Sequence, residues 1–207
     1  MVCKSQSGFL YPLCLGDEVN FRLTYDGPLK AASQSETRRV EKHTIRCVFS
    51  RQLLQLYTYR DAEFLAAEWD REPPLPVKRG EFRCMALVRE RLNLVCDLDI
   101  LFLRRENPGQ LIHHGGDIDN RIKVLFDSLR IPQDDQEVRG CKPEGDSKLL
   151  FCLTENDSLI TGFRVTTDQL LEPPASTAEQ NNVQLVINVE VKATKLTPEN
   201  MAYFSHF

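Results

Sequence analysis

The sequence lacks the features that mark several large protein classes. No apolar run approaches the roughly 20 residues of a membrane-spanning helix, and the apolar segment at residues 9–15 is short and interrupted by Pro12, unlike a secretion signal. A glycine-rich nucleotide-binding loop, an internal repeat and a low-complexity tract are also missing from the sequence. We therefore expect a cytoplasmic protein with no membrane-embedded part and no organic cofactor.

The sequence also shows no cysteine spacing typical of metal binding and no excess of basic residues. The seven cysteines form no CxxC pair and no regular spacing, which argues against a zinc site and predicts reduced thiols, mostly among apolar neighbours. The formal net charge is −4, from 26 basic and 30 acidic residues. This charge excludes a uniformly basic surface for nucleic acid, so any phosphate-binding surface must be a local patch.

What remains has the composition of an ordinary globular protein, with 42% hydrophobic and 27% charged residues in a chain of 207. A domain contains roughly 150 residues, and the proline-rich connector at residues 71–82 shows no composition shift that would mark a boundary. We predict a single domain over residues 1–207.

Hydrophobic periodicity predicts a mixture of strands and helices. Apolar residues alternate with polar ones at residues 19–25, 93–103 and 183–192, which is typical of strands buried on one face, and residues 159–167 are also predicted to form a strand. Residues 37–58 instead carry apolar side chains at three- and four-residue steps, which predicts a long helix. The basic residues Arg38, Lys42 and Arg46 share another stripe of that helix.

The segment HHGGDIDNRIKVLFDSL, residues 113–129, is the most unusual in the chain. A glycine pair leads into Asp117 and Asp119 and then into a short amphipathic helix, where Asp119, Lys123 and Asp127 share one side. Such a junction can bind a divalent cation, because Mg²⁺ takes carboxylate oxygens together with water and substrate phosphate. The structural alternative is that Asp119 caps the helix and the three charges form a solvated ion-pair stripe.

This segment resembles the D-x-D-N-x-x-K signature of the RusA family of Holliday junction resolvases. The matching residues are Asp117, Asp119, Asn120 and Lys123, and Asp127 continues the helix of the family. The match is specific over residues 117–129 and weaker over residues 151–167. Elsewhere it rests on the order of the expected elements.

The family has a further essential aspartate at the head of the strand that follows this helix, and two residues here could supply it. Asp135, in IPQDDQEV, lies closer to the helix than the family spacing. Asp157 precedes the apolar run at residues 159–165, and we favour it because a strand end positions a ligand more rigidly than a loop does. With Asp157 in this role, residues 130–150 become a surface insertion relative to small family members.

The resemblance implies an α+β fold in which helices pack on a single mixed β-sheet. It also implies a Mg²⁺-dependent, structure-selective endodeoxyribonuclease, with Mn²⁺ as a possible substitute, that resolves four-way (Holliday) DNA junctions in recombination and repair. The partners would be branched DNA and a second copy of the chain, since a two-fold enzyme suits a near-two-fold substrate. Asp117, Asp119 and either Asp157 or Asp135 would bind the metal, and Lys123 would contact the scissile phosphate.

DNA must then be held through its phosphates. The basic residues near the first helix and the motif are the candidates, namely Lys30, Arg38, Arg39, Lys42, Arg46 and Arg121. The alternative for each of them is a solubilising role on an exposed face.

Other readings of a DxD pair fit less well. Metal-dependent glycosyltransferases and haloacid-dehalogenase-type phosphatases place the pair directly after an apolar strand, whereas HHGG precedes Asp117. Asp97 and Asp99 do follow an apolar run, but strand alternation puts them on a polar, solvated side. The remaining alternative is a non-catalytic module of the same fold that binds branched DNA, from a mobile element or a defence operon.

Overall fold

The computed structural model describes residues 18–29, 35–59, 76–105, 118–143, 148–172 and 182–205. Its strands are β1 (Glu18–Pro28), β2 (Val77–Arg79), β3 (Phe82–Val88), β4 (Leu94–Arg104), β5 (Leu149–Thr154), β6 (Ile160–Gln169) and β7 (Asn182–Ala193). The α-helices are α1 (Ser35–Tyr59), α3 (Ile118–Leu129) and α4 (Pro198–Ser205), and short 3₁₀ helices are η1 (Glu90–Leu92), η2 (Asp135–Val138) and η3 (Asp157–Leu159). The predicted α+β class is confirmed.

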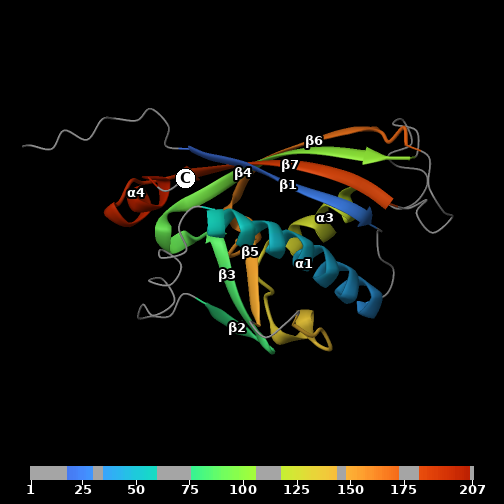
Figure 1. The fold of residues 1–207 in the computed structure, drawn as a ribbon, viewed down its shortest axis with the longest axis horizontal. Helices are drawn as coiled ribbons and strands as arrows, with labels where there is room; N and C mark the ends of the chain where they lie inside the picture. Colours follow the sequence, from blue (N-terminus) through green and yellow to red (C-terminus); the bar gives the residue numbers. More distant parts are fainter. Residues whose placement is uncertain are drawn as a thin grey trace, which may run out of the picture.

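Four strands form a large sheet in the order β1-β7-β4-β6. β7 is antiparallel to both β1 and β4, whereas β4 and β6 are parallel. Along β4 and β7 every second side chain is buried, from Leu94 to Phe102 and from Val183 to Val191. Figure 1 shows α1 and α3 on one side of this sheet, where they cover the apolar face. The strands predicted from the sequence are confirmed in β1, β4, β6 and β7.

The expected single sheet is wrong, because β2, β3 and β5 form a second sheet of their own. In Figure 1 this small sheet lies on the same side of the large sheet as α1. Side chains of β3 alternate between two apolar cores: Met85 and Leu87 join the main core, whereas Cys84 and Ala86 join a smaller one. A strand buried on both faces shows no apolar–polar alternation, so periodicity does not reveal it.

Residues 130–143, expected as part of a surface insertion, are only partly superficial. Ile131 and Val138 are buried in the smaller core, and η2 begins where the Asp134 side chain accepts hydrogen bonds from the amides of Gln136 and Glu137. The end of the predicted insertion, from Leu149, belongs to β5. Sequence polarity did not indicate this burial, because a few apolar residues are enough to hold an otherwise polar segment against the core.

The five cysteines in the described residues are free thiols. Burial raises the pKa of Cys84 to about 11 and that of Cys96 to about 12. These two thiols are therefore protonated at neutral pH and pack as small apolar side chains. No helix within the described ranges is long and apolar enough to cross a membrane.

Candidate functional site

Helix α3 presents the motif residues next to an apolar face. Ile122, Leu125 and Leu129 are buried against the main core, as the sequence pattern predicts. Asp119 and Lys123 lie on the exposed side. Asp117 comes directly before α3 and lies outside the described residues, as does the HHGG segment. The helix therefore fixes three of the four motif residues, Asp119, Asn120 and Lys123, at the protein surface, with Asp119 and Lys123 one turn apart.

A pocket of about 560 Å³ lies between α3 and β6, and we call it the α3–β6 pocket. Its charged lining consists of Asp119, Lys123 and Asp127 from α3 and Asp157, the first residue of η3. Its volume falls in the range of small-molecule sites, roughly 300–1,000 Å³. Helix α3 and η3, which are distant in the sequence, thus both contribute charged side chains to the α3–β6 pocket.

Backbone contacts explain why Asp157 reaches this pocket. The Ile131 amide, just after α3, donates to the Thr154 carbonyl at the end of β5 at 3.0 Å, so the end of α3 lies against the end of β5. After Thr154 the chain turns, and the Asn156 side chain accepts a hydrogen bond of 3.0 Å from the Ser158 amide. This cap starts η3 with Asp157 at its head, immediately before β6.

Asp135 lies elsewhere. Its carboxylate accepts a hydrogen bond of 2.8 Å from the Gly80 amide, in the turn between β2 and β3. It lines a different pocket, of about 320 Å³, together with Arg139 and Cys141. The structure therefore brings Asp157, rather than Asp135, to the pocket that contains Asp119 and Lys123.

The carboxylates of the α3–β6 pocket suit Mg²⁺. Asp119 and Asp157 are exposed, and neither side chain forms an ion pair or hydrogen bond in the described part of the chain. Within those same residues no three His, Cys, Asp or Glu side chains are grouped to hold a metal, and the third predicted carboxylate, Asp117, is outside them. Mg²⁺ is commonly bound by one or two carboxylates with water and substrate phosphates, and Asp119 and Asp157 are side chains of that ligand type.

Lys123 does not form the ion-pair stripe considered from the sequence. Asp127, one turn further along α3, is bonded instead to Lys42 Nζ at 3.2 Å and to Arg130 Nη2 at 2.8 Å. Among the described residues, Lys123 has no carboxylate within ion-pair distance. Its ammonium group is therefore available to an anion that enters the α3–β6 pocket.

Asp127 belongs to a network of ion pairs that links α1, α3 and η2. Glu137 Oε1 accepts from Arg130 Nη2 at 2.8 Å, and Glu137 Oε2 accepts from Arg46 Nη2 at 3.3 Å. Burial raises the pKa of the Asp127 carboxyl, but the Lys42 and Arg130 cations outweigh it and hold this pKa below its ordinary value. This ion-pair network holds α3, and with it the motif residues on α3, against α1.

Most of the basic residues predicted to bind DNA are buried, largely covered or outside the described residues. Arg46 and Arg121 are only 1% and 4% exposed, so this structure does not present their side chains to DNA. Lys42 is largely covered and paired with Asp127. Arg38 and Arg39 are half-buried in the first turns of α1, and Lys30 lies outside the described residues. Periodicity identifies residues on one helix face, but not whether acidic partners cover that face.

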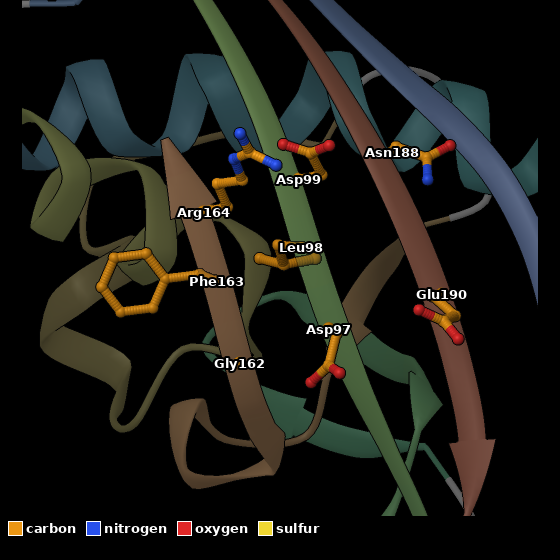
Figure 2. Close-up of a pocket in the computed structure, with 8 residues that line it drawn as sticks. All are labelled: Asp97, Leu98, Asp99, Gly162, Phe163, Arg164, Asn188 and Glu190. Carbon is orange, nitrogen blue, oxygen red and sulfur yellow. The ribbon is translucent and has the colours of Figure 1, made fainter. Parts of the chain in front are cut away.

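Asp97 of β4 has a structural role on the other face of the large sheet. Figure 2 shows Asp97 beside Gly162, with Glu190 on the neighbouring strand. The Asp97 carboxylate accepts from Thr161 Oγ1 at 2.7 Å and from Lys192 Nζ at 2.9 Å, and both bonds hold its pKa below its ordinary value. These oxygens are engaged, and β4 is an interior strand with one solvated face.

Sequence reasoning assigned no role to Phe163, which lines the pocket together with Phe126. Phe163 is 59% exposed on β6 and contacts the ring of Phe126 edge-on, with centroids 5.1 Å apart. Figure 2 shows its ring beyond the β6 edge of the sheet. The sequence signal is that Phe163 is the one aromatic residue in the largely polar segment ITGFRVTTDQ.

Comparison with protein-family models, curated proteins and solved structures finds no match to this chain. The resemblance to the RusA family therefore rests on the motif residues and stays a prediction. Independently of that motif, the structure shows that Asp119, Lys123 and Asp157 line one pocket.

Proposed function

We propose that the protein is a Mg²⁺-dependent endodeoxyribonuclease that cuts branched DNA, above all four-way junctions, and that the α3–β6 pocket is its active site. The observation that carries the proposal is that Asp119, Lys123 and Asp157 line this one pocket. The D-x-D-N-x-x-K match covers only α3 and the residues before it. Asp157 comes from a separate segment, so its arrival in the same pocket supports the proposal independently of that match.

Each charged residue of the pocket has a role in phosphodiester hydrolysis. When bound, Mg²⁺ supplies an activated water and neutralises charge that develops on the phosphate. Asp119 and Asp157 would hold it, together with Asp117. Lys123 contacts a non-bridging oxygen of the scissile phosphate and stabilises the negative charge of the transition state. The exposure of Asp119 and Lys123 leaves both open to a large polymeric substrate.

The preference for branched DNA follows from the family resemblance and from charge. A chain with net charge −4 cannot hold long duplexes by a general basic coat. A homodimer would present two α3–β6 pockets to the two equivalent strands of a four-way junction. In recombination and repair, such an enzyme would separate joined duplexes by paired nicks.

The proposal is tested with an end-labelled synthetic four-way junction and a linear duplex that contains one arm sequence. In Mg²⁺ or Mn²⁺ we expect paired nicks on the junction and little cleavage of the duplex, and in EDTA we expect neither. Tight junction binding without cleavage in either metal would contradict the nuclease and favour the binding module of the same fold. If the protein neither binds nor cuts the junction, the motif match is misleading.

A further inference from the structure

The α3–β6 pocket contains more apolar surface than phosphate chemistry requires. Next to its charged residues it has an apolar wall, formed by Ile118, Ile122, Phe126, Phe163 and Val165. A hydrated metal ion and a phosphate are bound by charged and polar groups, and an apolar wall offers them nothing. The volume of about 560 Å³ leaves room for a larger group beside them.

The charged residues and the apolar wall run side by side along the same helix. Asp119 and Lys123 form one i, i+4 stripe of α3, and Ile122 and Phe126 form the neighbouring one. A nucleotide has the same arrangement, since its charged phosphate and its flat apolar base are joined through the sugar. A phosphate at Lys123 would therefore direct its own base towards the apolar wall.

Phe163 gives this wall the surface that a base requires. Phe163 is 59% exposed as a residue, although it lines a pocket. The edge-on contact with Phe126, at an interplanar angle of 85°, restrains the ring. Exposed, restrained aromatic rings are the usual platforms on which proteins stack single bases, whatever the base sequence.

We propose that the apolar wall binds one unstacked nucleobase of the nucleotide at the scissile phosphate, with Phe163 as its stacking platform. This inference rests on the proposed nuclease function and names its substrate class, which is DNA with an unpaired or weakly stacked nucleotide at the cut site. In a continuous duplex the base must first leave its stack, whereas at a branch point this cost is smallest. Selectivity for branches then arises inside the active-site pocket.

A fluorescent base tests the proposal without any cleavage. The adenine analogue 2-aminopurine brightens when it leaves a base stack, and it is placed at the branch point or in the middle of an arm, in EDTA. We expect wild type and Phe163→Tyr to brighten the branch-point probe only. Phe163→Ala should bind the junction but leave this probe unchanged. Equal signals from wild type and Phe163→Ala would overturn the proposal.

Cleavage in Mg²⁺ gives the second readout. We expect Phe163→Ala to cut the junction about 10-fold more slowly, the size of one lost base–aromatic stack, and Phe163→Tyr to cut at the wild-type rate. The control is Leu171→Ala, since Leu171 is 86% exposed outside the pocket. If wild type cuts junctions and Phe163→Ala cuts equally fast, this inference fails while the proposed function stands. If wild type cuts no junction, the proposed function itself fails.

Discussion

Asp157→Asn should lower junction cleavage at least about 100-fold, because loss of a metal ligand costs no less than loss of a residue that supports one. Asp157 faces the same pocket as Asp119 and Lys123. The amide of asparagine keeps the shape of the carboxylate but lacks the charge that holds Mg²⁺. Because the side chain is exposed and forms no hydrogen bond among the described residues, stability and junction binding in EDTA should change little.

The matched control is Asp135→Asn, the other aspartate that could complete the motif. Its oxygen accepts from the Gly80 amide, and an asparagine oxygen can still accept this bond. We expect it to cut junctions at close to the wild-type rate. The reverse result, with Asp135→Asn inactive and Asp157→Asn active, would move the active site to the pocket beside η2.

Arg130→Met should lower the free energy of unfolding by about 3 kcal/mol at pH 7, because it leaves two partly buried carboxylates without their main cation. The Arg130 side chain is 3% exposed and bonded to both Asp127 and Glu137, each at 2.8 Å. It also donates to the Ile131 carbonyl at 3.0 Å. Urea unfolding measures the loss, and Arg139→Met is the control, since that exposed side chain should contribute less than about 0.5 kcal/mol.

The same variant has a definite pH dependence. The folded-state pKa of Asp127 is lowered by Lys42 and Arg130 against the effect of burial. A lowered pKa stabilises the fold above the unfolded value of about 3.9, and this contribution is lost as the pH falls through the folded value. The difference between wild type and Arg130→Met should therefore shrink below about pH 4. A difference that is constant down to about pH 3 would show that Arg130 acts through packing alone.

Sequence periodicity predicts the helices and strands that have one apolar face and one solvent-facing face. In β1, β4 and β7 buried side chains alternate with more accessible ones, and α3 has one apolar side, so each leaves a periodic pattern. β3 and β5 lie between two cores and leave no such pattern. The second sheet is therefore invisible to periodicity, and the single-sheet prediction fails for this reason.

The residues of the candidate site also fall into two groups: those that local sequence spacing predicts and those that only tertiary contacts reveal. Asp119 and Lys123 are found from local spacing, because both lie on one helix. The choice between Asp157 and Asp135 depends on how β5 meets the end of α3, which is a tertiary contact. Arg46 was misplaced because its acidic partner Glu137 lies far away in the sequence. Phe163 was missed because only the fold brings it to the pocket.

The most direct test of the nuclease compares wild type and Asp119→Asn on one labelled four-way junction, with cleavage in Mg²⁺ and binding in EDTA. Asp119 is the motif residue that the structure places in the α3–β6 pocket. We predict paired nicks by wild type, none by Asp119→Asn, and equal binding by both proteins. Cleavage by Asp119→Asn at the wild-type rate would contradict the assignment of this pocket as the active site.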